Sequence, residues 1–338
     1  MRSLIRLLPI LVVAAATFAH AQDAAYTPKR INKAIELLDM GQPIYYTGSH
    51  EGTDATFEQG KLDAQTWADY INYDMEVGPF DVAGLAAYMK GLKAGGPTRS
   101  GHATPAVIVV LPVRGTDEAN VRYNAWMVEQ VLATGVHGIM LPHATTAGAV
   151  RALVEAIRYP NRESGPEGYR GAHGAAAASK IWGVTPQEYQ RKADLWPLNP
   201  EGELLLGVKI EDKFALPNIQ AIVEVPGLGF GEGGPGDMGV STGYARTDPR
   251  LQEIEDRIWK AAKAQKKYWL GVNARDIEGS ITEGRMVGSG EATAAAGRKF
   301  TKRAMPYSPF RRRKNERPAP SSGPFCIFHL LPLRAGES

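Results

Sequence analysis

Short apolar runs alternate with amphipathic segments from residue 22 to residue 307. Eight of these runs have the length and β-branched content of buried strands, which predicts strands at residues 43–49, 69–76, 105–113, 137–143, 203–211, 219–225, 267–273 and 286–290. Apolar residues recur every three or four positions in four intervening segments, which predicts helices at residues 82–92, 119–135, 146–160 and 251–265. The alternation predicts an α/β fold, a (β/α)8 barrel, whose active site lies where strands end and loops begin.

The first residues of the chain differ from this alternating body. Two arginines precede a short apolar run, and Ala19-His20-Ala21 gives the small-x-small pattern that signal peptidase cleaves. Residues 1–21 are therefore predicted to be a signal peptide, which implies a periplasmic or secreted protein. A membrane anchor is disfavoured because the run is about half of the ~20 residues that a spanning helix requires. We expect residues 22–307 to form the barrel domain, with no membrane association after cleavage.

The last residues also differ from the body. Residues 308–338 join a basic run to a Pro/Ser-rich stretch with no hydrophobic period, which predicts a disordered tail. The tail and the signal peptide together carry more positive charge than the formal net charge of +3, so the body is acidic. This excludes a basic nucleic-acid-binding protein. Cys326 is the only cysteine, which excludes an internal disulfide and a cysteine-based zinc site.

A glycine-rich stretch, EVPGLGFGEGGPGDMG at residues 224–239, allows two interpretations. Gly229, Gly231 and Gly234 have the G-x-G-x-x-G spacing of a dinucleotide-binding turn, but that turn should lead directly from a strand into a long helix. Here many residues separate the glycines from the helix predicted at residues 251–265, which disfavours nucleotide binding. The second interpretation is a loop that brings a carboxylate to a strand end.

Two carboxylates fit that second interpretation. Glu211 closes the strand predicted at residues 203–211, and Asp237 follows the one at 219–225 after the glycine loop. Neighbouring parallel strands would direct both into one mouth, where Mg²⁺ or Mn²⁺ prefers oxygen ligands. The glycines would let backbone N–H groups approach a substrate carboxylate. The alternative is that both carboxylates only cap helices.

Residues 210–239, IEDKFALPNIQAIVEVPGLGFGEGGPGDMG, resemble the HpcH/HpaI aldolase and citrate lyase family, in which an Ile-Glu pair and a Gly-Pro-x-Asp sequence carry the metal ligands. The resemblance extends over roughly residues 43–307. It implies a TIM barrel of the phosphoenolpyruvate/pyruvate type and a homo-oligomer. It also implies that Glu211 and Asp237 hold Mg²⁺ or Mn²⁺, and that the backbone of Gly236 and Asp237 binds the substrate carboxylate.

The chemistry implied by the resemblance is carbon–carbon bond cleavage or formation next to a small 2-oxo acid. A divalent metal holds the keto oxygen and the carboxylate, and it stabilises the enolate as charge develops. This is class II aldolase chemistry, which uses no covalent lysine intermediate. A base must still move a proton.

The resemblance fails at one catalytic position. The family's second strand ends Asp-x-Glu-His, which makes Asp74 and Glu76 site residues, but Val77 stands in place of the acid/base histidine. Valine cannot move a proton, so another base is required. His143 ends the fourth predicted strand and His102 precedes the third, so both are candidates, and His143 would face the mouth.

The second departure from the family pattern concerns a positively charged residue. The family's third-strand arginine corresponds to Ile108, and neither Arg114 nor Arg122 can be assigned to its role. Lys209 lies two residues before Glu211 and shares its mouth-facing side by strand alternation. It could supply the missing charge; the alternative is an ion pair with a neighbouring glutamate.

These patterns predict an exported, metal-dependent aldolase or lyase for 2-oxo acids. The competing hypothesis is a non-catalytic or redirected relative that still binds a divalent metal and a small carboxylate, and Val77 is the feature that favours it. An unrelated barrel hydrolase with paired carboxylates is disfavoured because no second acid stands opposite Asp237 at a recognisable spacing.

Overall fold

The structure, a computed structural model, describes residues 27–48 and 56–301. The predicted signal peptide and tail lie outside these described residues, so both stay predictions. In the described part of the chain, none of the helices combines the length and the apolar character that crossing a bilayer demands.

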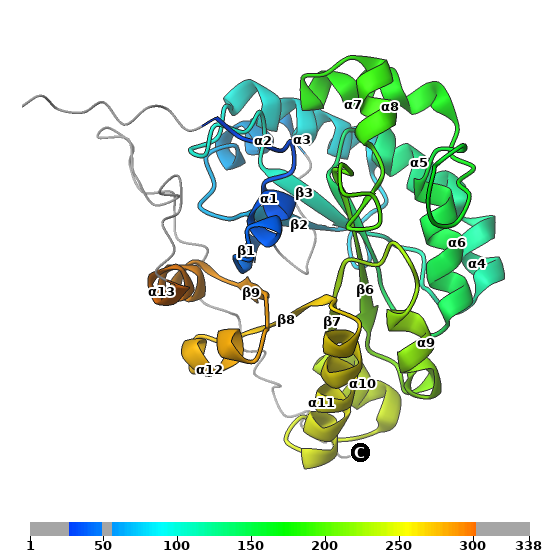
Figure 1. The fold of residues 1–338 in the computed structure, drawn as a ribbon, viewed down its shortest axis with the longest axis vertical. Coiled ribbons are helices and arrows are strands. Elements are labelled where there is room, and N and C mark those ends of the chain that lie inside the picture. Colours follow the sequence, from blue (N-terminus) through cyan, green and yellow to red (C-terminus); the bar gives the residue numbers. More distant parts are fainter. Residues whose placement is uncertain (1–26, 49–55, 302–338) are drawn as a thin grey trace, which may run out of the picture.

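Eight parallel strands form a closed barrel, and this confirms the predicted fold class (Figure 1). Closure is made by β1 pairing with β9 and by β4 pairing with β6. A two-residue strand, β5 (Leu195–Trp196), adds to the start of β6. The barrel strands are β1 (Ile44–Thr47), β2 (Tyr70–Asp74), β3 (Ala106–Val110), β4 (Gly138–Leu141), β6 (Leu204–Ile210), β7 (Phe230–Gly233), β8 (Tyr268–Val272) and β9 (Val287–Ser289).

Helices surround the barrel, and Figure 1 shows α12 and α13 on the side of β8 and β9. The four predicted helices are confirmed, although the second is divided at Asn124 into α4 and α5. The helices are α1 (Lys33–Asp39), α2 (Phe57–Asp63), α3 (Val82–Gly95), α4 (Glu118–Tyr123), α5 (Ala125–Ala133), α6 (Ala147–Ile157), α7 (Ala175–Trp182), α8 (Pro186–Lys192), α9 (Ile219–Val223), α10 (Pro235–Thr242), α11 (Pro249–Ala264), α12 (Ile277–Thr282) and α13 (Glu291–Thr301). Two 3-10 turns cover Ala172–Gly174 and Lys213–Asn218.

One predicted strand is wrong. Residues 219–225 contain helix α9, in which Ile219, Ile222 and Val223 are buried at the three- and four-residue spacing of one helical face. The sixth barrel strand in the chain is instead β7, whose sequence Phe-Gly-Glu-Gly has little apolar signal. Gly231 is required there because a Cβ atom would collide with the ring of Trp269.

The barrel interior is an apolar core that α1 closes at the amino ends of the strands. Tyr70 packs against Tyr46 and Phe230 inside the barrel, with ring centroids 5.3 and 6.3 Å apart. The apolar side chains of α1 join the same core. Asn32 caps α1 and donates its side-chain amide to the backbone oxygens of His137 and Glu203, which fixes the helix against β4 and β6.

The other end of the interior is polar. Lys209 and Glu232 are paired in register on β6 and β7, and Asn72 and Asp74 occupy the end of β2. Lys209, Asn72 and Asp74 are nevertheless buried. Burial of a polar side chain costs free energy unless the side chain is hydrogen-bonded. The carboxyl ends of the strands, which carry this polar layer, are therefore the end of the barrel where a functional site is expected.

Candidate active site

Three side chains with metal-ligating atoms meet at the carboxyl ends of the strands. Glu76 lies two residues after β2, His143 two residues after β4, and Glu211 directly after β6. One ligand atom from each lies within 4.8 Å of those of the other two. Parallel strands place these residues together because all of their carboxyl ends open at the same side of the barrel.

His143 is held by contacts on its backbone and on both ring nitrogens. Its backbone N–H donates to Glu211 Oε1 over 3.0 Å. Its Nε2 lies 3.0 Å from Glu76 Oε1, and its Nδ1 lies 2.7 Å from Asp212 Oδ2. The residue has a φ of 49°, a conformation uncommon outside glycine and found more often at turns and functional sites.

Lys209 crosses the mouth and pairs with Glu76. Its Nζ lies 2.7 Å from Glu76 Oε2, although β6 and β2 are not neighbours in the barrel. Burial lowers the pKa of the Lys209 ammonium, but the charges of Glu232, Glu76 and Glu211 outweigh it, so this pKa lies above its ordinary value. The lysine is therefore a fixed positive charge. The predicted alternative of an ion pair with a neighbouring glutamate is present in the structure.

Glu211 is the more deeply buried of the two carboxylates in this group. Burial raises its pKa from 4.5 to about 7, and Glu76 adds to this, against the lowering effect of Lys209 and of the His143 backbone N–H. Gly234 packs directly against Glu211, and a Cβ atom there would collide with the carboxylate. The glycine-rich segment thus gives Glu211 the space it occupies.

Asp74 shapes the turn that carries Glu76. Its Oδ1 accepts hydrogen bonds from the backbone N–H groups of Glu76 at 2.8 Å and Val77 at 3.2 Å. The Val77 side chain is 69% exposed. Asp74 therefore holds the turn that carries Glu76, while the fourth position of the Asp-x-Glu-His pattern is an exposed valine.

Asp237, the second metal ligand expected from the resemblance, lies in the first turn of α10 and is exposed. It is not one of the three grouped ligand residues. Gly236 precedes it, with open space where a Cβ atom would stand. Their roles in holding a metal and a substrate carboxylate stay predictions.

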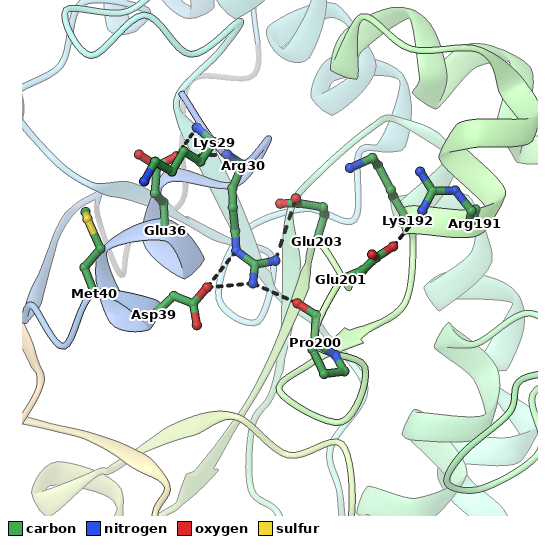
Figure 2. A pocket seen from close by; sticks show the side chains of 10 residues that line it. All are labelled: Lys29, Arg30, Glu36, Asp39, Met40, Arg191, Lys192, Pro200, Glu201 and Glu203. Atoms are coloured by element: carbon green, nitrogen blue, oxygen red, sulfur yellow. Dashed lines mark hydrogen bonds and ion pairs between the residues drawn. The ribbon is translucent and has the colours of Figure 1, made fainter. Parts of the chain in front are cut away.

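His102, the second candidate base, lies at the opposite end of the barrel. It precedes β3, its Nδ1 is 2.9 Å from Ser100 Oγ, and its Nε2 is 3.3 Å from Glu36 Oε2 on α1. The same end carries a hollow of about 520 Å³. There Arg30 bonds Asp39 and the backbone oxygen of Pro200 (Figure 2). His102 therefore belongs to the amino-end contacts of α1.

The two unassigned arginines do not join the cluster. Arg122 pairs with Glu118 and Glu155 on the outer helices, at 2.7 and 2.6 Å. Arg114 is exposed in the loop after β3. Ile108, at the position of the family's arginine, is fully buried in the apolar interior. Lys209 is thus the buried cation that contacts the cluster among the described residues.

Sequence reasoning missed Asp212. Its carboxylate holds His143 Nδ1, but the sequence shows only an acidic residue after Glu211. The pairing of β4 with β6, Leu141 opposite Val208, brings the two strand ends together. An Asp following a strand-end Glu, combined with a His at another strand end, would have been the available signal.

Comparisons with known proteins place the sequence beside characterised relatives. The sequence profile described as HpcH/HpaI aldolase/citrate lyase matches residues 105–301, more than half of the chain. A 2-keto-3-deoxy-L-rhamnonate aldolase of Salmonella paratyphi B is 32% identical over 162 residues, which cover 46% of this chain and 53% of that protein. The chain thus spans about half the length of the curated relatives it matches.

Solved structures show the same fold. An HpcH/HpaI aldolase from Desulfitobacterium hafniense superposes with a TM-score of 0.58 at 20% identity, covering 81% of this chain and 98% of that one. A family protein from Burkholderia cenocepacia gives a TM-score of 0.57 at 20% identity, covering 77% and 93%. At this identity the likeness is one of fold.

Proposed function

Because the chain belongs to the HpcH/HpaI aldolase/citrate lyase family, we propose that it is a divalent-metal-dependent carbon–carbon lyase acting on 2-oxo acids. The observation that supports this proposal most is the group of Glu76, His143 and Glu211 at the carboxyl ends of three barrel strands. In a (β/α)8 barrel this end carries the active site.

The donor set fits a divalent cation. Glu76 and Glu211 offer carboxylate oxygens and His143 offers an imidazole nitrogen, all within 4.8 Å of one another. Buried carboxylates placed this close repel each other unless positive charge lies between them. When bound, the cation would act as a Lewis acid that stabilises negative charge on the substrate's keto oxygen.

The chain's own residues supply the rest of the site. Lys209 places a fixed positive charge beside Glu76, and this charge favours a substrate that becomes more negative during the reaction. The backbone N–H groups of Gly236 and Asp237 begin α10, where a substrate carboxylate would be favoured. Asp237 remains a proposed additional oxygen ligand.

The proposed reaction is aldol cleavage of a 4-hydroxy-2-oxo acid, or its reverse. The bond between carbons 3 and 4 breaks, the hydroxyl on carbon 4 loses its proton and becomes an aldehyde, and carbon 3 receives a proton to give a 2-oxo acid. The Salmonella relative is named for such a sugar-acid aldolase. A homo-oligomer and an exported protein are part of the same proposal.

His143 is the histidine of this group, with its Nε2 beside Glu76 Oε1, so it is the first candidate for the proton transfer. It can take a proton only through Nε2, because Asp212 occupies Nδ1. The same Nε2 lone pair could instead bind a cation. One nitrogen cannot do both at once.

Hydrogen exchange of pyruvate tests the proposed function without knowledge of the aldehyde. Protein supplied with Mn²⁺ is incubated with pyruvate in D2O, and loss of the methyl proton signal is followed by NMR. We expect exchange by the wild type, and a loss of at least about 100-fold in Glu211→Gln, since electrostatic stabilisation of an oxyanion is typically worth this much. Glu253→Gln on α11 is the control. Metal binding without exchange would support the non-catalytic relative instead.

A further inference from the structure

The hydrogen bond between Asp212 and His143 determines which nitrogen of the ring carries a lone pair. Asp212 Oδ2 lies 2.7 Å from Nδ1. A carboxylate only accepts, so Nδ1 carries the N–H and, in the neutral ring, Nε2 carries the lone pair. That lone pair faces Glu76 Oε1 at 3.0 Å. Two electron-rich atoms at this distance repel unless a proton or a cation bridges them.

The distances suit a cation that binds both atoms. First-row metal ions bind imidazole nitrogen and carboxylate oxygen at about 2.0–2.2 Å, so two ligands at right angles stand about 3 Å apart. The separation of His143 Nε2 and Glu76 Oε1 is 3.0 Å. Glu211 supplies a third ligand atom, and the three atoms all lie within 4.8 Å of one another.

Each of the three side chains also has a partner that orients it. Asp212 holds His143, Lys209 Nζ holds the second oxygen of Glu76 at 2.7 Å, and the His143 backbone N–H holds Glu211 Oε1 at 3.0 Å. A carboxylate on the far nitrogen of a ligating histidine is the usual arrangement in metal sites, because it fixes the tautomer and raises the basicity of the ligating nitrogen.

We propose that His143 Nε2 is a metal ligand together with Glu76 and Glu211, that Asp212 is its positioning residue, and that the site consequently prefers a first-row transition ion over Mg²⁺. The inference rests on the cation of the proposed function and specifies how it is held. Imidazole binds transition ions better than Mg²⁺, which prefers oxygen. In this assignment His143 is not the base of the reaction.

Calorimetric titration of untagged protein with Co²⁺ and with Mg²⁺ tests the preference. We expect Co²⁺ to bind at least about 10-fold more tightly than Mg²⁺. His143→Gln and Asp212→Asn should each weaken Co²⁺ binding by about 10- to 100-fold and change Mg²⁺ binding much less. The exposed His173 provides the matched control, His173→Gln, with unchanged affinities. Equal affinity for both ions in the wild type would overturn the preference.

Pulsed electron paramagnetic resonance of the Mn²⁺-loaded protein tests the ligand itself. We expect nitrogen hyperfine coupling in the wild type and in His173→Gln, and none in His143→Gln. Bound Mn²⁺ without nitrogen coupling in the wild type would overturn the ligand assignment, and this readout holds even if His143→Gln does not fold. Coupling without pyruvate exchange would contradict the proposed function alone. Exchange without coupling would contradict this inference alone.

Discussion

Lys209 Nζ and Glu76 Oε2 lie 2.7 Å apart across the barrel mouth, on strands that do not pair. The contact therefore depends on the closed barrel rather than on any local pairing. It keeps one positive charge beside the cluster and leaves the other oxygen of Glu76, Oε1, facing His143. The same side chain would thus serve both the stability of the mouth and its chemistry.

Lys209→Met is expected to destabilise the protein and to slow pyruvate exchange. It leaves Glu76 and Glu232 without their cation in a mostly buried site, and loss of one partner of a buried pair costs roughly 3 kcal/mol. Denaturant unfolding measures the change. The double variant Lys209→Met/Glu76→Gln should recover part of this stability without recovering exchange. If Lys209→Met and the double variant are equally stable, the ion pair between Lys209 and Glu76 does not contribute to the stability of the fold.

The stability of the metal-free protein should fall as pH rises from 5 to 7.5. Glu211 has a folded pKa of about 7 against an ordinary 4.5, so in this window the folded state retains a proton that the unfolded chain releases, and the free energy of unfolding decreases. The effect is at most about 3 kcal/mol. Denaturant titrations at both pH values should show a smaller slope with pH in Glu211→Gln. An identical slope in that variant would exclude Glu211 as the source.

Val77→His should increase pyruvate exchange. The side chain at this position is exposed and follows the turn held by Asp74, so a histidine can be accepted with a stability change within about 0.5 kcal/mol. Positioned acid/base groups contribute about 10²–10⁴-fold, and NMR exchange rates measure the gain. Val77→Gln is the control for side-chain size. A slower Val77→His would mean that the wild-type site already has a working base elsewhere.

Asp69→Asn should strongly destabilise the protein. Asp69 lies before β2, at the end of the barrel opposite the cluster. Asp69 is fully buried between Lys33 at 3.0 Å and Arg298 at 2.5 Å, and so joins α1 and α13 to the start of β2. Removing its charge leaves two buried cations, which costs about 3–5 kcal/mol. Thermal unfolding should show the loss, while Asp39→Asn at an exposed ion pair should change stability by less than about 1 kcal/mol.

The barrel could be predicted from sequence because most of its strands are continuous apolar runs between amphipathic helices. The exception is β7, which has glycines where Trp269 approaches and therefore lacks an apolar run. The apolar run of the neighbouring helix α9 was interpreted as the strand instead. Helix α1 was also missed. Its apolar side chains fill the end of the barrel, a role that depends on tertiary packing.

The sequence predicts which residues lie at the strand ends of the candidate site, but it does not predict which of them contact one another. Glu211, His143 and Lys209 follow from position along a strand, and Glu76 follows from the family resemblance. Which of them touch depends on the stagger of strands around the barrel, for example the pairing of Leu141 with Val208 that brings His143 to Asp212. A single sequence does not specify such cross-strand registers.

Helix α1 seals the amino end of the barrel, with Asn32 bonded to the starts of β4 and β6. If cleavage occurs at the proposed cluster, both products share a single exit. The 2-oxo acid would be held deepest, by the cation, and the aldehyde would lie nearer the opening. For that proposed reaction we expect the aldehyde to depart first, and to arrive last when the reaction runs toward synthesis.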